Sequence, residues 1–511
     1  MKRVVACLLV VALAMISLAA CSTGEPKQDP GAAAPPRDTI NLALVGVVSS
    51  LDPYATALTV DLEVFHQIYE GLYYVDDFSQ VHPRIALSHE ISPDGRVYTF
   101  KIRQDAFFHN GDPVTADDVV FSFQKAMESG VMAPYVGIIE EVKKVGEDSV
   151  QMTLQQAYTP FLNNTTNVFI VSKKAYEEAG DKFGSTVTGA GTGPYKVVSF
   201  DGNTKVSLEA FDKYYRGVAP IKYANYIVMA DVSAGLIAFE NGELDFYAIP
   251  PANWAEISGS GKYTTKLNPT THISYILLNP ASGVLKNQDL RYAIQYAIDR
   301  EAINAMAYEN LADPAYHMMR PDYIFGASED TFKFTYDPAK AKEYLAKAGY
   351  PNGVDIGELQ YTTANYFPKI AQAFQAQLAD VGITCTITGG QTSQLVVGWR
   401  AGDFNMLCSG FNAMLDYDYY TRYTSPGVST SFLKYQNTDY DADWVLEMYN
   451  KGAAELDPAK RQAIYEELEN FIAKTACYIP IFYKTLPYAW NKNLNVELDM
   501  NWYYLFDWSW K

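Results

Sequence analysis

The sequence predicts a mixed α/β fold, because strand-like segments alternate with segments that carry helix start and stop signals along its 511 residues. Apolar and polar residues alternate over 98–102, which is the period of a half-buried strand. Thr115 followed by Asp118 is typical of a helix N-terminus, where each side chain can bond the other residue's backbone N–H. Asp337-Pro338 and Asp457-Pro458 also predict helix starts, since proline is tolerated in the first turn.

The other elements follow in chain order. The helix that begins at Thr115 has one apolar face, formed by Val119, Val120, Phe123 and Met127. Further strands are expected over 206–208, 273–278, 383–388 and 478–482. The helix that begins at Asp337 should end at Gly349. The buried face of the helix that begins at Asp457 comprises Ile464, Leu468, Phe471 and Ile472. At roughly 150 residues per domain, the chain should form two to four domains.

The N-terminus has the pattern of a bacterial lipoprotein signal peptide. Lys2 and Arg3 precede an apolar run over 4–18, which is shorter than a membrane span and typical of a secretion signal. The run closes with Leu18-Ala19-Ala20-Cys21, which resembles the lipobox, where a diacylglycerol is attached to the cysteine thiol. An ordinary secretory signal with a coincidental cysteine is the alternative.

A signal peptide over 1–20 would leave Cys21 as the lipid-bearing first residue of the mature protein. Two acyl chains hold a protein on a bilayer far better than one. Residues 21–38 are rich in Pro, Gly and Ala, which predicts a flexible tether. The folded body is therefore expected on the outer face of the cytoplasmic membrane, on its extracellular or periplasmic side.

The composition is that of a folded and acidic protein. Hydrophobic residues make up 48% and charged residues 19%, which argues against disorder over most of the length. The net charge of -19 disfavours nucleic acid as a partner, because phosphate backbones are bound by basic patches. The 39 tyrosines pack their rings while offering hydroxyl groups, so an aromatic and hydrated cleft is plausible.

The cysteines predict neither a zinc site nor a dithiol redox centre. Of five cysteines, Cys7 is lost with the signal and Cys21 carries the lipid, so Cys385, Cys408 and Cys477 remain in the body. No two of them have the CxxC spacing that such sites need. No cofactor is expected.

Three other motifs have a structural interpretation that we favour. Residues 189–193 are glycine-rich but lack the Lys-Ser/Thr of a phosphate-binding loop, so a tight turn between domains is expected. Asp439, Asp441 and Asp443 alternate as in a calcium loop, but Trp444 stands where the glycine of such a loop belongs. The six histidines are scattered without i, i+4 pairing, which argues against a dedicated metal site.

Catalysis is not expected, although an extracellular hydrolase remains the alternative from another class. A hydrolase needs an activated nucleophile or a carboxylate pair with separated environments. The sequence offers no GxSxG, HExxH or SxxK arrangement with matching partners. Asp416 and Asp418 could form a carboxylate pair, but they lie in a tyrosine-rich segment whose hydroxyl groups could equally bond them.

Motifs over essentially the whole mature body carry a family resemblance. They are Ser50-Leu51-Asp52-Pro53, Tyr69-Glu70-Gly71-Leu72, Ser92-Pro93-Asp94-Gly95 with Tyr98-Thr99-Phe100, Phe108-His109-Asn110-Gly111, Gly191-Thr192-Gly193-Pro194-Tyr195, Leu290-Arg291, Asp299-Arg300, Tyr336-Asp337-Pro338, Gly349-Tyr350-Pro351 and the stretch from Arg461 to Phe482. In order and spacing they resemble the bacterial extracellular solute-binding proteins of family 5, which are the oligopeptide, dipeptide and nickel receptors of ABC importers.

The resemblance implies a periplasmic-binding-protein-like fold with two lobes, a hinge and three domains. Domain I would be discontinuous and comprise 39–69, 191–268 and 486–511. Domain II would span 70–190, and domain III 269–485. The chain would cross between the lobes near 266–271 and near 485–487, and closure about these crossings would enclose the ligand. A monomer that delivers its solute to ABC permease subunits is the implied arrangement.

The resemblance also implies where the solute binds. In the peptide receptors, the ligand lies extended between short protein strands, much like an added strand. One matching segment includes Tyr54, Thr56, Ala57 and Thr59. The other is Gly410-Phe411-Asn412-Ala413-Met414, in which Phe411 keeps the family's aromatic residue. Core packing is the alternative role for Tyr54 and Phe411.

Met414 departs from the family pattern and leaves the ligand class open. Receptors for free peptides have Asp there to pair with the ligand's α-ammonium, a desolvated charge that needs a partner. Asp416 or Asp418 could substitute for it. Cys408 falls near a family arginine that binds the ligand carboxylate, and Arg400 is the nearest cation. An oligopeptide-like solute is therefore weighed against a nickel or other metal chelate, a sugar-like molecule or another small solute.

Overall fold

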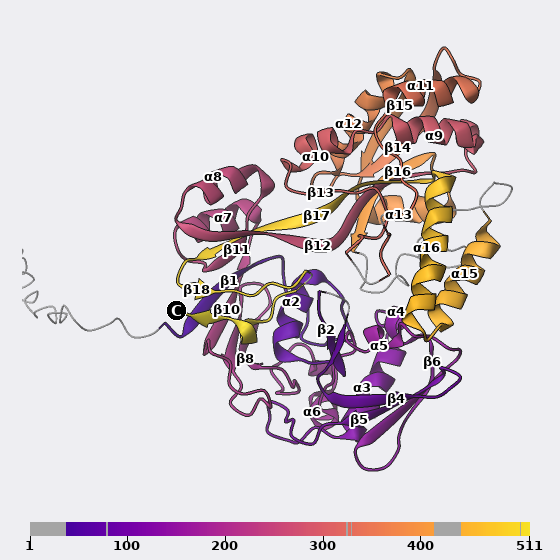
Figure 1. Ribbon diagram of the computed structural model, residues 1–511. Helices are drawn as coiled ribbons and strands as arrows, with labels where there is room; N and C mark the ends of the chain where they lie inside the picture. Colours follow the sequence, from indigo (N-terminus) through magenta and orange to yellow (C-terminus); the bar gives the residue numbers. More distant parts are fainter. Residues whose placement is uncertain (1–36, 78–79, 323–324, 329, 413–440, 501) are drawn as a thin grey trace, which may run out of the picture. The chain divides into compact units, whose positions relative to one another are not determined.

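An 11-stranded mixed sheet organises the part of the chain that the structure describes (Figure 1). This computed structural model describes residues 37–77, 80–322, 325–328, 330–412, 441–500 and 502–511. Asp38–Lys511 form one compact unit. The strand order of the large sheet is β15-β14-β16-β12-β17-β11-β1-β10-β9-β8, with β13 paired to β17. Helices and several sheets are present together, so the predicted mixed α/β fold is confirmed.

One end of the large sheet is built around β1. The elements here are β1 (Thr39–Val45), α2 (Thr59–Ile68), β8 (Tyr195–Asp201), β9 (Lys205–Ala210), β10 (Tyr223–Met229), α7 (Val232–Glu240), β11 (Phe246–Ala248), α8 (Trp254–Gly259), β18 (Leu494–Asn495) and β19 (Ser509–Trp510). Strand β1 pairs in parallel with β10, and its side chains Ile40, Leu42 and Leu44 are buried at every second position. That alternation directs one face of the strand into the core.

The opposite end of the sheet carries the longer helices. The elements here are α9 (Gln288–Tyr296), α10 (Arg300–Tyr308), β13 (Asp313–Pro314), α11 (Pro338–Lys347), β14 (Val354–Thr362), α12 (Phe367–Ala379), β15 (Ile383–Gly390), α13 (Thr392–Ala401), β16 (Met406–Asn412), α15 (Ala442–Ala454) and α16 (Pro458–Thr475). Both predicted caps form, since the carboxylates of Asp337 and Asp457 accept hydrogen bonds from N–H groups in the first turns of α11 and α16. The expected strands at 206–208, 273–278, 383–388 and 478–482 are confirmed as well.

A four-stranded antiparallel sheet forms a smaller layer. Its order is β4-β5-β7-β6, and its neighbourhood comprises β2 (Tyr73–Val75), β3 (Val81–Pro83), β4 (Ala86–Ile91), β5 (Val97–Ile102), α3 (Ala116–Glu128), α4 (Ala133–Val136), β6 (Ile139–Lys144), β7 (Ser149–Leu154), α5 (Phe161–Asn164) and α6 (Lys173–Ala179). The predicted capping box of α3 is confirmed between Thr115 and Asp118. Met127 does not join the buried face of α3, since it is 39% exposed in the last turn.

Two long strands connect the two ends of the large sheet. They are β12 (Tyr263–Leu278) and β17 (Tyr478–Asn491), which lie side by side in Figure 1. The two strands are antiparallel, and Pro269 pairs with Thr485 whereas Ile273 pairs with Tyr483. The register shifts between these two pairs, because more residues of β12 than of β17 lie between them. The irregular pairing begins at Pro269 and Thr485, which fall within the two expected crossings. Within the described residues, no helix has the length and apolarity needed to cross a membrane.

Candidate functional site

The described part of the expected solute strand belongs to β16, next to the irregular pairing. Gly410 pairs with Ser274, Phe411 with Ile273 and Asn412 with His272, all on β12. The Phe411 side chain is 6% exposed and packs edge-on against Tyr275, with 5.7 Å between ring centroids. Phe411 therefore packs in the core, whereas the side chain of Asn412 is exposed.

Gly410 leaves room for an imidazole ring that sequence reasoning missed. A Cβ atom on Gly410 would lie 2.5 Å from His272 Nε2, which is closer than real Cβ atoms come. His272 Nδ1 lies 3.1 Å from Asn412 Oδ1, and this acceptor assigns the proton to Nδ1. Burial and the nearby Lys484 ammonium lower the pKa of His272 to about 3, so the ring is neutral at physiological pH. The pair fixes the end of β16 against β12.

The other expected solute segment is not a strand. Tyr54 lies in a turn, and α2 begins at Thr59, so no strand forms between them. The Tyr54 hydroxyl donates a hydrogen bond to Phe169 O at 2.7 Å, and the Thr56 hydroxyl donates to Asp61 Oδ2 at 2.6 Å. Both side chains are buried, whereas Ala57 and Thr59 are exposed. The strand expectation was wrong because one local bond, to Asp61, and one long-range bond, to Phe169, hold the segment outside any strand.

The remaining candidates divide into three groups. Arg400 is exposed in the last turn of α13. Cys408 is fully buried and its pKa is raised by desolvation, so it stays a neutral thiol that cannot replace a cation. Met414, Asp416 and Asp418 lie outside the described residues, as does Cys21.

An aromatic surface formed by His66, Trp502 and Tyr504 lies beside β12 and β17, the two long strands. The ring of His66, on α2, lies 4.4 Å from the Trp502 ring, 5.8 Å from Tyr504 and 5.4 Å from Phe169, measured between centroids. His66, Trp502 and Tyr504 are half-buried. Their assembly could not be predicted residue by residue, because α2 and the C-terminal segment are more than 400 residues apart. The tyrosine-rich composition was the one sequence feature that indicated an aromatic surface.

A carboxyl group with a raised pKa links this surface to β12. The backbone carbonyl of Asp499 accepts a hydrogen bond from Asn268 Nδ2 at 2.8 Å, and Asp499 Oδ2 accepts one from the Tyr74 hydroxyl at 3.4 Å. Burial and the neighbouring carboxylate of Asp77 raise the pKa of Asp499 to about 7. This side chain therefore provides either a donor or a negative charge near neutral pH.

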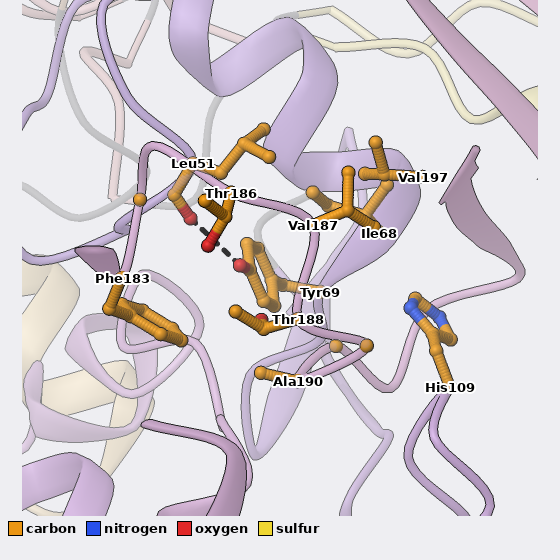
Figure 2. A pocket seen from close by; sticks show the side chains of 13 residues that line it. Leu51, Ile68, Tyr69, His109, Phe183, Thr186, Val187, Thr188, Ala190 and Val197 are labelled. Carbon is orange, nitrogen blue, oxygen red and sulfur yellow. Dashed lines mark hydrogen bonds between the residues drawn. The ribbon is translucent and has the colours of Figure 1, made fainter. Parts of the chain in front are cut away.

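The cavity in Figure 2 is too small for a solute. It lies among Leu51, Ile68, Tyr69, His109 and the loop 183–191, and its volume is about 20 Å³. The Tyr69 hydroxyl donates to Leu51 O at 2.8 Å across it. A volume of this size holds about one water molecule.

The glycine-rich loop beside that cavity packs closely against the end of α2. A Cβ on Gly191 would lie 2.1 Å from Ile68 O, and one on Gly193 would lie 2.6 Å from Gln67 O. Glycine is needed because the loop packs directly on the backbone at the end of α2. Among the described residues, no group of three His, Cys, Asp or Glu side chains is placed to hold a metal ion.

The comparison with protein families decides the class of the protein. The family model "Bacterial extracellular solute-binding proteins, family 5 Middle" matches residues 80–431, which is more than half of the chain. The chain belongs to this family. The family 5 resemblance inferred from the motifs is therefore confirmed, and so is the binding-protein fold with its mixed α/β architecture.

Curated relatives and solved structures agree with this membership. The "Glutathione-binding protein GsiB" of Salmonella paratyphi A is 26% identical over 464 residues, covering 87% of this chain and 89% of that protein. The GsiB of Escherichia coli O6:K15:H31 is also 26% identical, with the same coverage. These relatives are named as binding proteins and not as enzymes.

The solved structures share the fold of this family 5 protein. The ABC transporter substrate-binding protein CtaP of Listeria monocytogenes has a TM-score of 0.83 at 23% identity, covering 93% of this chain and 99% of that one. NikA of Brucella suis, in complex with Fe(III)-EDTA, has a TM-score of 0.83 at 22% identity, covering 93% and 100%. DppA of Helicobacter pylori, in complex with the peptide STSA, has a TM-score of 0.75 at 23% identity, covering 93% and 98%.

Proposed function

We propose that this family 5 protein is a lipid-anchored receptor that captures an oligopeptide-like solute between two lobes and delivers it to an ABC permease. The observation that carries the proposal is the pair of long strands β12 and β17, whose pairing becomes irregular beside β16. A solute held at the end of β16 would lie next to the place where the sheet can bend. Closure of the lobes then requires no reaction, only a higher affinity for the closed state.

The proposed domain boundaries agree with the distribution of strands. Strands β2 to β7 fall in 70–190, the proposed domain II, and β13 to β16 fall in 269–485, the proposed domain III. The irregular pairing lies at the boundary between domain I and domain III, near Pro269 and Thr485. This arrangement supports a hinge made of two strands that belong to one monomer.

Two relatives support a peptide-like solute, and one supports the alternative. GsiB is named for glutathione, which is itself a short peptide, and DppA was solved with the peptide STSA. NikA was solved with a metal chelate, Fe(III)-EDTA, so a chelate is the second candidate. The exposed end of β16 favours the peptide, because a strand edge can pair with an extended backbone.

The proposed function predicts ligand-dependent compaction. Ligand is extracted from the purified protein, identified by mass spectrometry and added back to the stripped protein. Small-angle scattering should then show a smaller radius of gyration at saturation, because closure brings the lobes together. An unchanged radius at saturating ligand would contradict closure, and recovery of cleaved peptide would favour the hydrolase alternative.

The lipid anchor predicts the effect of a single substitution. Cys21→Ser removes the thiol that the lipobox-like motif Leu18-Ala19-Ala20-Cys21 presents, so the protein should leave the membrane fraction for the medium or the periplasm. Immunoblots of membrane and soluble fractions measure this, with Cys7→Ser as the matched control inside the signal peptide. A Cys21→Ser protein that stays as membrane-bound as the parent would refute the anchor.

A further inference from the structure

Three neighbouring strands share a row of buried side chains next to the expected solute strand. Strand β12 lies between β16 and β17 (Figure 1). Phe411 on β16 pairs with Ile273 on β12, and Ile273 pairs with Tyr483 on β17. All three side chains are buried in one hydrophobic cluster. This row therefore defines the face of the three strands that points into the core.

The next residue on each strand points to the opposite face, because side chains alternate along a strand. These residues are Asn412 on β16, His272 on β12 and Lys484 on β17. Asn412 pairs with His272 in the strand register, and its Oδ1 lies 3.1 Å from His272 Nδ1. Asn412 is exposed, whereas His272 and Lys484 are half-buried. Lys484 therefore lies on the same face as the exposed end of β16.

Backbone contacts hold Lys484 close to His272. Lys484 lies opposite the extra residues of β12, where the register shifts. The Thr270 hydroxyl donates a hydrogen bond to Lys484 O at 2.7 Å and accepts one from the His272 N–H at 3.1 Å. The Lys484 ammonium also contributes to the low pKa of His272, so its positive charge lies near the imidazole ring.

The Lys484 ammonium has no negative partner among the described residues. Burial lowers its pKa, and no carboxylate of the described chain offsets this effect. His272 does not supply the missing charge, since its ring is neutral and its Nε2 is buried without a hydrogen-bond partner. A cation that has lost part of its water needs a negative partner. This position is therefore suited to an anionic group that arrives from outside.

We propose that Lys484 binds a carboxylate of the solute, so that the receptor selects peptide-like solutes with a free carboxylate next to the end of β16. The inference rests on the proposed function, because it assigns a charge preference to the same solute strand. The exposed amide of Asn412 would donate a second hydrogen bond. The chain has a net charge of -19, which disfavours anionic solutes, so a local cation is needed for such a preference.

The position of Lys484 also relates this contact to closure. Arg400, the cation first considered for the ligand carboxylate, is exposed in the last turn of α13, outside the row formed by the three strands. Lys484 instead precedes the expected crossing near 485–487. A solute that pairs with the end of β16 and bonds Lys484 would contact the strand proposed to bend. Its affinity would then depend on the angle between the lobes, as closure requires.

Calorimetry with N-acetylated peptides tests the charge preference, because the acetyl group removes the α-ammonium and its separate contribution. Matched tri- to pentapeptides with apolar side chains are compared as C-terminal acids and C-terminal amides. The parent should bind the acids roughly tenfold to a hundredfold more tightly. Amides with one glutamate, placed at each position in turn, then identify the source of the carboxylate. Recovered affinity shows that a side-chain carboxylate is bound as well, and affinity that stays low assigns the contact to the C-terminus.

Two substitutions of Lys484 and a matched control complete the test. Lys484→Met should lower the affinity for acids to that for amides, whereas Lys484→Arg should keep the preference because it retains the charge. Methionine is unbranched and adapts to its surroundings, so Lys484→Met should fold, which its Tm checks. Lys492→Met is the control, since Lys492 is exposed in the turn after β17 and its loss changes the net charge equally.

The outcomes separate this inference from the proposed function. Equal affinity of the parent for acids and amides overturns the carboxylate contact and leaves the receptor function intact. An unchanged preference in Lys484→Met has the same meaning, because another group then binds the carboxylate. If the parent binds no peptide in either form, the proposed peptide receptor is contradicted, and the inference fails with it.

Discussion

Replacing Glu70 by alanine should lower the free energy of unfolding by about 3 to 5 kcal/mol, because the substitution leaves a buried cation without its partner. Glu70 follows α2 and is 7% exposed. Its Oε1 accepts hydrogen bonds from the hydroxyls of Tyr214 at 2.7 Å and Tyr215 at 3.0 Å, and it lies 3.5 Å from Arg84 Nε. The guanidinium of Arg103 packs on the Tyr215 ring at 3.4 Å, so Glu70 holds a tyrosine against which a second cation lies.

Urea denaturation of the parent and the Glu70→Ala variant measures this loss. Glu140→Ala is the matched control, because Glu140 also pairs with an arginine, Arg96 at 3.2 Å, but its side chain is 58% exposed. An exposed ion pair contributes at most about 1 kcal/mol, so the control should unfold almost as the parent does. Equal stability of the two variants would show that the Glu70 cluster contributes no more than a surface pair.

The cluster has a functional consequence because of the elements that it joins. Glu70 leads from α2 into β2, Arg84 follows β3, and Tyr214 follows β9 of the large sheet. The Glu70 N–H also donates to Thr192 Oγ1 at 3.2 Å, beside the glycine-rich loop. The contacts tie proposed domains I and II together. A lobe that closes as one body needs such a connection, because bending would otherwise be shared between two junctions.

The fold could be predicted where the determining contacts are local. The caps of α3, α11 and α16 each depend on residues within three positions of one another, and all three form as expected. Met127 shows the limit of a helical pattern, because this apolar residue in the last turn of α3 is 39% exposed although it lies on the predicted apolar face. The segment around Tyr54 and Thr56 was expected to be a strand but is not one. Its side chains bond to Phe169 and Asp61 instead, and the sequence pattern gave no sign of these two bonds.

The site was less predictable because its contacts join distant parts of the chain. Gly410 and His272 are 138 residues apart, and nothing near either residue in the sequence indicates that the imidazole lies over the glycine. The expected position of the solute strand came from the family motifs and not from local patterns of polarity.

Installing an acid at position 414 should raise the affinity for short peptides with free N-termini about a hundredfold. The described part of β16 ends at Asn412, so this expectation depends on the aligned motif Gly410-Phe411-Asn412-Ala413-Met414. An α-ammonium that leaves water without meeting a carboxylate loses a few kcal/mol, which corresponds to that factor. The parent should therefore prefer N-acetylated peptides, and Met414→Asp should prefer free ones.

Calorimetry with matched pairs of free and N-acetylated di- to pentapeptides tests this preference. Met127→Asp is the control, because it makes the same chemical change at an exposed position on α3, far in sequence from the solute strand. Net charge alone would shift the affinity equally in both variants, whereas a specific ion pair acts only at 414. If the parent already binds free peptides tightly and prefers them, another carboxylate receives the amine. Asp416→Asn and Asp418→Asn then identify it, because the variant that loses the preference has lost the partner of the α-ammonium.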